Sequence, residues 1–119
     1  RSSEHMRLVS SVFHNRLRTG GDYKYLNCDP TREYVNNYIT GNPLVADQSK
    51  YAALYNTCNK RVGLPAGPIC CPGLKAIDAA RNPADTNYYY FFYGKDNTNH
   101  YSETLEEHNR QMAEIGVDG

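Results

Sequence analysis

The sequence has no tryptophan, no excess charge of either sign and no long hydrophobic run, and these absences exclude several classes of protein. Its 13 basic and 13 acidic side chains cancel, so it lacks the basic surface of nucleic-acid binders and of polybasic membrane-surface proteins. The longest apolar run lies within residues 88–93, far too short to cross a bilayer. No His, Cys or carboxylate cluster has metal-site spacing, so we expect no metal and no cofactor.

Two residue types stand out instead, tyrosine and cysteine. The eleven tyrosines can pack in a core with their hydroxyls hydrated, and tyrosine also stacks on sugar rings. We expect packing alone for most of them. An even number of cysteines fits disulfides in an oxidising compartment, and free buried thiols are the alternative. A bridge between the adjacent pair would be strained, so pairing with one of the other two is favoured. The disulfide candidates are Cys28, Cys58, Cys70 and Cys71.

Apolar spacing predicts several helices in a chain whose 119 residues suit one domain. Residues 4–18 form an amphipathic pattern, with Asn15 among the polar positions and glycines at its end. Asp29 and Pro30 signal the start of a second helix, with Asp29 as the capping residue. A third helix is expected over residues 47–54, again with an aspartate start. Between the first two helices, residues 23–26 read as a short edge strand.

The second half of the chain predicts a long loop, a hairpin and two more helices. Residues 63–73 contain three prolines and three glycines, which excludes a helix or a central strand. A helix follows with Leu74, Ile77 and Ala80 inward. Strands are expected over residues 87–93 and 100–102, and a final helix opens at a Thr104 capping box. The fold class is therefore α+β: helices packed on a small, mostly antiparallel sheet with a long Pro/Gly-rich loop.

The order of these motifs resembles the YceG-like endolytic murein transglycosylase family, over the C-terminal part of its catalytic domain. Each block is short, but six of them follow in the right order over nearly the whole chain. They are Val-Phe-His-Asn-Arg-Leu at 12–17, Asn-Cys-Asp-Pro-Thr at 27–31, Tyr-Asn-Thr at 55–57, Gly-Leu-Pro-Ala-Gly-Pro-Ile at 63–69, the aromatic run 88–92, and His-Tyr-Ser at 100–102 with His108 and Asn109 beyond it.

The chain departs from the family pattern in two ways. Cys28, Cys58 and Cys71 stand where the family usually has other residues, which suggests a disulfide between the Asp-Pro-Thr element and the long loop. The family's catalytic glutamate precedes the Val-Phe-x-Asn-Arg-Leu helix, so the resemblance places it upstream of Arg1. The domain over residues 1–119 is then expected to lack its N-terminal segment. Glu4 is the fallback for the catalytic acid, although a helix-start role favoured by the dipole suits it better.

The resemblance implies a lytic transglycosylase that cleaves the β-1,4 bond between N-acetylmuramic acid and N-acetylglucosamine. One carboxylic acid protonates the leaving oxygen and then accepts a proton from the muramoyl 6-hydroxyl, which closes a 1,6-anhydro ring. Such an acid needs a raised pKa and a partly desolvated pocket. The implied location is the extracytoplasmic face of a bacterial cell, with a membrane anchor outside this chain. The implied partners are glycan strands and other cell-wall synthesis proteins.

Polar residues of the matched blocks are the candidates for binding the sugar. Several also have a structural interpretation: Asp29 and Thr31 can cap a helix, and Asn56 and Thr57 can satisfy loop backbone. His5 and His14 are expected at the surface and His108 in the core. A catalytically silent glycan-binding or scaffold domain is the alternative function, and an unrelated secreted disulfide protein is a third. The substrate-binding candidates are Asp29, Thr31, Tyr55, Asn56, Thr57, His100, Ser102 and Asn109.

Overall fold

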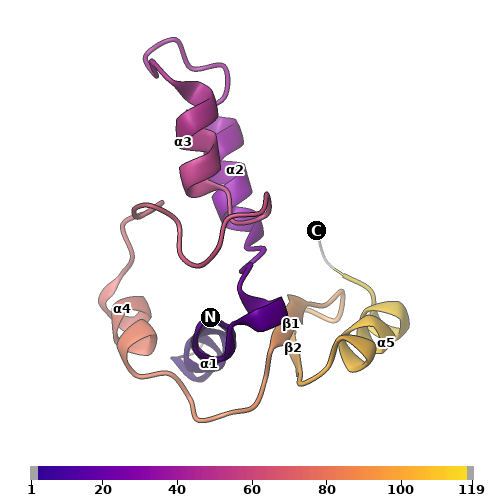
Figure 1. Ribbon diagram of the computed structural model, residues 1–119. Coiled ribbons are helices and arrows are strands. Elements are labelled where there is room, and N and C mark those ends of the chain that lie inside the picture. Colours follow the sequence, from indigo (N-terminus) through magenta and orange to yellow (C-terminus); the bar gives the residue numbers. More distant parts are fainter. Residues whose placement is uncertain (1–2, 118–119) are drawn as a thin grey trace. The chain divides into compact units, whose positions relative to one another are not determined.

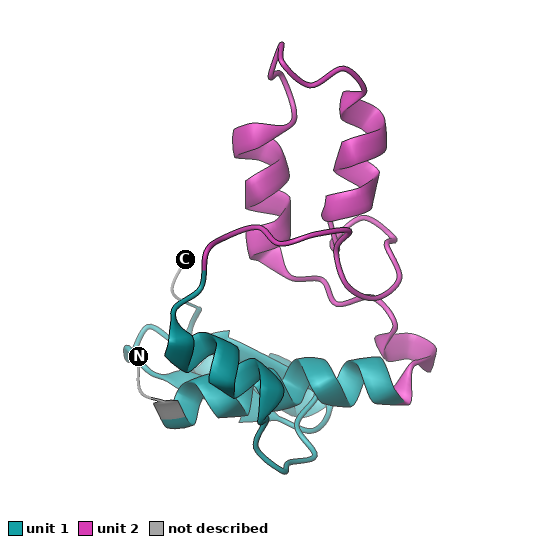
Figure 2. Ribbon diagram, turned by 90° about the vertical axis from the view of Figure 1, so that its left-hand side faces the viewer, with its two compact units in different colours: residues 1–18, 72–119 teal, residues 19–71 magenta. Residues whose placement is uncertain are grey.

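The computed structural model describes residues 3–117, and over that range it contains five α-helices and one two-stranded antiparallel sheet (Figure 1). The α+β prediction is confirmed. The chain divides into two compact units, shown in different colours in Figure 2. Unit 1 comprises Arg1–Arg18 and Pro72–Gly119, and unit 2 is the intervening Thr19–Cys71. Within the described residues, no helix combines the length and the hydropathy needed to cross a membrane.

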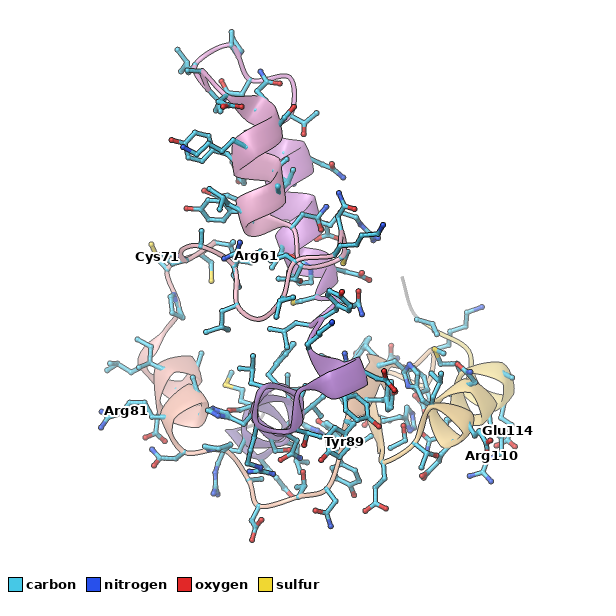
Figure 3. The ribbon with its side chains drawn as sticks, in the orientation of Figure 1. Arg61, Cys71, Arg81, Tyr89, Arg110 and Glu114 are labelled. Carbon is cyan, nitrogen blue, oxygen red and sulfur yellow. The ribbon has the colours of Figure 1, made fainter. Side chains whose placement is uncertain are left out.

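Unit 1 is built around a β-hairpin that is covered by a helix. Strands β1 (Tyr90–Tyr93) and β2 (Asn99–Ser102) pair so that Phe92 faces His100. Helix α5 (Leu105–Ile115) packs on both strands. It begins as predicted, because the Thr104 side chain accepts a hydrogen bond from the Glu107 amide at 3.2 Å. Arg110 and Glu114 project from α5 on the side away from the hairpin, and both are exposed (Figure 3).

Two further helices complete unit 1, and one of them turns a different face inward from the one predicted. Helix α1 spans Ser3–Thr19 and buries Val12. Helix α4 spans Leu74–Arg81 and buries Ala79, whereas Leu74 and Ile77 are 85% and 43% exposed. Ala80 is also exposed, so the expected inward face of α4 was wrong. A small residue at the contact lets the helix approach closely, and periodicity alone does not show which side has a partner.

Unit 2 is a pair of helices with a long loop. A single 3₁₀ turn, η1 (Gly21–Tyr23), begins the unit. Helices α2 (Asp29–Tyr38) and α3 (Gln48–Tyr55) follow, and they lie side by side in both ribbon views. Val35 and Ile39 are buried. Asp47 caps α3 as predicted, accepting from the Lys50 amide at 3.1 Å.

Two local predictions in unit 2 were wrong. Cys28, not Asp29, is the N-cap of α2, and its side chain makes no capping bond. The expected edge strand over residues 23–26 is reduced to one antiparallel bridge between Tyr25 and Val62. The pairing does not continue beyond this bridge, so the segment does not form a strand.

Candidate functional site

The Asp-Pro-Thr and Tyr-Asn-Thr blocks meet in unit 2 through two buried threonine hydroxyls, here called the threonine pair (Thr31 and Thr57). Their oxygens lie 2.8 Å apart, and Thr57 is fully buried. Thr31 donates to the Cys28 carbonyl at 2.6 Å and accepts from the Thr57 amide at 3.0 Å. Thr57 accepts from the Cys28 amide at 2.9 Å. Every hydroxyl and amide in this set has a partner, so the pair fastens the start of α2 to the turn after α3.

The other unit 2 candidates surround the threonine pair and are more accessible. Asp29 is exposed and forms an ion pair with Arg32 at 3.4 Å. Asn56 is half-buried, and its side-chain oxygen accepts from the Cys58 amide at 2.9 Å. The Tyr55 ring lies against Tyr34, with ring centroids 5.4 Å apart.

The Pro/Gly-rich loop approaches this group at Gly67. A Cβ at Gly67 would lie 2.9 Å from the Tyr55 hydroxyl, so a larger residue would require the Tyr55 side chain to shift. The loop is fixed to α3 nearby, because the Ala66 amide donates to the Leu54 carbonyl at 2.9 Å. The sequence therefore brings together three of its matched blocks, at 27–31, 55–57 and 63–69, within unit 2.

The predicted disulfide is absent, because all four cysteines are free. Cys28 and Cys58 are half-buried, and burial is the main cause that raises the pKa of each thiol. The Cys58 thiol donates to an Asp29 carboxylate oxygen at 3.7 Å. Cys70 and Cys71 are exposed in the loop that leads to α4, where Figure 3 labels Cys71. The cysteines therefore give no support for an oxidising compartment.

In unit 1, the Asn-Arg of the first matched block binds the segment that precedes β1. Asn15 is 4% exposed, not on the polar face as predicted, and donates to the Thr86 and Tyr88 carbonyls at 2.8 and 2.9 Å. Arg16 donates to the Tyr89 carbonyl. Arg18 in turn donates to the Asn15 side-chain oxygen at 2.7 Å. These two signature residues therefore fix the entry to the hairpin.

The hairpin carries an acid–base pair, of which the sequence analysis predicted only one member. His100 Nε2 lies 3.0 and 2.9 Å from the two carboxylate oxygens of Asp96, in the turn between the strands. We call these two residues the hairpin pair. The hydrogen bond to His100 is the main cause that lowers the pKa of Asp96. His100 was predicted as a site residue and Asp96 was not. Their spacing of four residues across a predicted turn was the signal that could have found it.

Several buried polar side-chain atoms described in unit 1 have no hydrogen-bond partner. His108 stacks on Tyr90, with ring centroids 5.1 Å apart, and burial, followed by the charge of Arg16, lowers the pKa of His108. Ser102 is 1% exposed, and its hydroxyl has no partner. The predicted Asn109 is exposed on α5. Further unpartnered side-chain atoms described in unit 1 are Ser10 Oγ, Asn99 Oδ1, His108 Nδ1 and Gln111 Oε1.

The remaining histidines and Glu4 lie on α1. His14 is exposed, as expected, and its Nε2 lies 2.7 Å from the Ala80 carbonyl. His5 is half-buried, contrary to expectation, and its Nδ1 lies 3.0 Å from the Tyr101 hydroxyl. Glu4 is exposed in the first helical turn. A shallow pocket of about 270 Å³ is lined by none of the predicted site residues; it is lined by Arg7, Leu74, Lys75, Asp78 and Ala79.

The structure therefore gathers the predicted site residues into two groups, one in each unit. Unit 2 holds the candidates from Asp29 to Thr57, and unit 1 holds His100, Ser102 and Asn109. The described residues contain no group of three or more His, Cys, Asp or Glu side chains arranged to hold a metal ion.

Comparisons with known proteins agree with the motif order. The YceG-like family matches residues 1–114. An endolytic murein transglycosylase of Bacillus subtilis (strain 168) is 34% identical over 102 residues, which is 86% of this chain and 27% of that protein. A crystal structure of a YceG-like protein from Listeria monocytogenes is also 34% identical, with a TM-score of 0.69 over 87% of this chain and 33% of that one. This chain thus spans about a third or less of either relative, and it belongs to the YceG-like family.

Proposed function

We propose that the chain is part of a peptidoglycan lytic transglycosylase, which cleaves the bonds between N-acetylmuramic acid and N-acetylglucosamine and leaves 1,6-anhydro ends. The observation that carries this proposal is the family match over residues 1–114. The name of the Bacillus subtilis relative, an endolytic murein transglycosylase, supports the same reaction and substrate. Glycan strands are then the main partner, alongside other proteins of cell-wall synthesis.

In this proposal each unit contacts the glycan strand through its own accessible polar side chains, and the buried ones hold them in place. The contacts are a hydroxyl, two amides, an imidazole and a carboxylate, all of which can hydrogen-bond to a hydroxyl-rich ligand. Buried Thr31, Thr57 and Ser102 act from the interior, because a sugar does not reach a side chain that is almost fully buried. The proposed contact residues are Asp29, Tyr55, Asn56, His100 and Asn109.

The proton-donating carboxylic acid of this reaction is not assigned to a residue of this chain. The reaction needs an acid in a partly desolvated pocket. Glu4 is exposed on α1, which is the wrong environment for that acid. The proposal therefore gives this chain the task of binding and orienting the glycan. It places the polypeptide at the extracytoplasmic face of a bacterial cell, where peptidoglycan lies, and attached to the membrane.

The exposure of Glu4 also favours a second candidate function, a catalytically silent module that binds glycan strands. The two candidates predict the same ligand and differ in whether a bond is broken. They are separable only by product analysis, because both predict that the chain binds peptidoglycan.

The test is a chimera in which this chain replaces the matching segment of the Bacillus subtilis relative. Purified peptidoglycan is digested, and the products are examined by mass spectrometry for 1,6-anhydro ends, with the unmodified relative as control. We expect anhydro products from the chimera. A folded chimera that binds glycan strands but yields none, while the relative does, would support the silent module instead. Anhydro products from the isolated chain would place the acid in it, and Glu4→Gln then tests Glu4.

A further inference from the structure

The side chains of the hairpin pair are held in a fixed orientation although both are partly exposed. The Asp96 side chain is 45% exposed and the His100 side chain 20% exposed. Both carboxylate oxygens lie within hydrogen-bond distance of one ring nitrogen, at 2.9 and 3.0 Å. A charge-assisted contact of this kind is stronger than one between neutral groups, and it fixes the direction of the imidazole.

Two neighbours in the hairpin fix the pair further. The His100 ring stacks on Phe92, its cross-strand partner, with centroids 5.1 Å apart and planes 26° apart. Gly94 lies beneath the pair. A Cβ at Gly94 would lie 2.5 Å from Asp96 Oδ1 and 3.0 Å from His100 Nε2, so a side chain here would displace the pair.

The geometry determines which ring nitrogen carries the hydrogen. A carboxylate only accepts hydrogen bonds, so the nitrogen that faces Asp96, Nε2, must be the donor. In the neutral imidazole the other nitrogen, Nδ1, is then an acceptor. Over the described residues, no hydrogen bond joins His100 Nδ1 to another protein group.

We propose that Asp96 is a positioning residue that fixes the Nε2–H tautomer of His100, so that Nδ1 accepts a hydrogen bond from a hydroxyl of the bound glycan. This inference rests on the proposed function for its ligand. Asp96 does not touch the sugar; it acts through His100. Gly94 takes part by leaving room for the two side chains.

A purely structural role for Asp96 predicts something different. The carboxylate also accepts from the Thr98 amide, which supports the turn and contributes to the lowered pKa of Asp96. If supporting the turn were its whole role, substitution would change stability and leave the tautomer of His100 unchanged. The decisive readout is therefore the tautomer.

The first measurement is a long-range proton–nitrogen NMR correlation on the imidazoles of this chain at about pH 8, above the ordinary imidazole pKa. His100→Phe identifies the signal and keeps a ring on Phe92. We expect one tautomer, Nε2–H, in the native chain. Asp96→Asn should give a mixture, because an amide can accept or donate, and Gly94→Ala should do the same by displacing the carboxylate.

The matched control is Asp85→Asn, which removes an exposed carboxylate without a hydrogen bond or ion pair among the described residues. A native Nδ1–H tautomer, or an unchanged tautomer in Asp96→Asn, overturns the proposal.

The second measurement is peptidoglycan cleavage by the chimera described above. Asp96→Asn should lower kcat/KM on the order of 10- to 100-fold, with partial rescue by Asp96→Glu and no change for Asp85→Asn. An active chimera in which Asp96→Asn matches Asp85→Asn overturns the inference alone. An inactive chimera removes the proposed function, and this inference falls with it, while the NMR result still reports separately on the tautomer.

Discussion

The buried hydroxyls of the threonine pair in unit 2 are hydrogen-bonded, whereas several buried polar atoms of unit 1 are not. In unit 2, the hydroxyls of Thr31 and Thr57 bond to each other and to the backbone around Cys28. In unit 1, half-buried His108 on α5 and buried Ser102 on β2 each keep a buried polar atom without a partner. Across the described residues, every such unpartnered atom lies in unit 1.

This difference affects how much the buried polar groups contribute to stability. A fully satisfied set of buried hydrogen bonds makes one arrangement of the chain favourable and has little capacity left for a ligand. A buried polar atom without a partner costs free energy, and in a native protein it calls for an explanation. The unpartnered atoms of unit 1 therefore mark a region whose packing is less favourable for stability than that of the threonine pair. Four substitutions test that contrast, in order of decreasing effect.

The largest effect on stability is expected at Asn15, a buried side chain of unit 1 whose amide nitrogen and oxygen are both hydrogen-bonded. Asn15→Leu keeps the branching of the side chain but leaves the Thr86 and Tyr88 carbonyls without their donors. The free energy of unfolding should fall by about 3 kcal/mol, since each unsatisfied buried group costs about 1–3 kcal/mol. Urea denaturation measures it. Asn87→Leu, at an exposed position of the same segment, should change little. Equal losses in the two variants would show that the buried contacts of Asn15 are unimportant.

Thr57→Val tests the threonine pair of unit 2. The substitution keeps the shape but removes the hydroxyl that accepts from the Cys28 amide. A loss of about 2 kcal/mol in the free energy of unfolding is expected. Thr40→Val, at an exposed position in the same unit, is the control. If Thr57→Val is as stable as the native chain, the threonine pair does not hold unit 2 together.

His108→Phe tests the pH dependence of unit 1. Burial lowers the pKa of His108, so the unfolded chain binds a proton more readily than the folded chain. The contribution of His108 is present above its ordinary pKa of 6.5 and is lost as the pH falls through its lowered folded value. Thermal melts from about pH 7.5 to 5.5 should show a smaller loss of stability in His108→Phe than in the native chain. An identical loss would contradict the assignment.

Ser102→Ala should have the smallest effect on the free energy of unfolding, and it is the closest comparison for Thr57→Val. Both variants remove a hydroxyl that is at most 1% exposed, but the Ser102 hydroxyl has no partner. The free energy of unfolding should therefore change by less than about 0.5 kcal/mol, or rise. A loss as large as that of Thr57→Val would mean that the two units do not differ in this respect.

Much of the fold follows from local chemistry that a sequence displays. Asp47 and Thr104 cap helices because their side-chain oxygens reach amides three residues ahead, which depends on nothing distant. The Pro/Gly-rich loop was predictable for the same reason. The inward face of α4 was not, because the choice between Ala79 and Leu74 depends on what lies beside the helix.

The candidate site was predictable only through motif order. Resemblance selected Thr31 and Thr57, but their mutual hydrogen bond depends on how α2 and α3 pair. Asp96 was missed because its role needs the turn geometry that brings it to His100. The disulfide was wrong since an even count of cysteines carries no information about their separation.

The most direct test of the account is to measure stability and cleavage on the same two variants, Thr57→Val and Asp96→Asn, in the chimera with the Bacillus subtilis relative. Below its melting temperature, Thr57→Val should be less stable and retain its activity per folded molecule. Asp96→Asn should keep its stability and lose most of its kcat/KM. The reverse pattern, a stable but inactive Thr57→Val beside an unstable but active Asp96→Asn, would contradict the division between a stabilising threonine pair and a ligand-ordering hairpin pair.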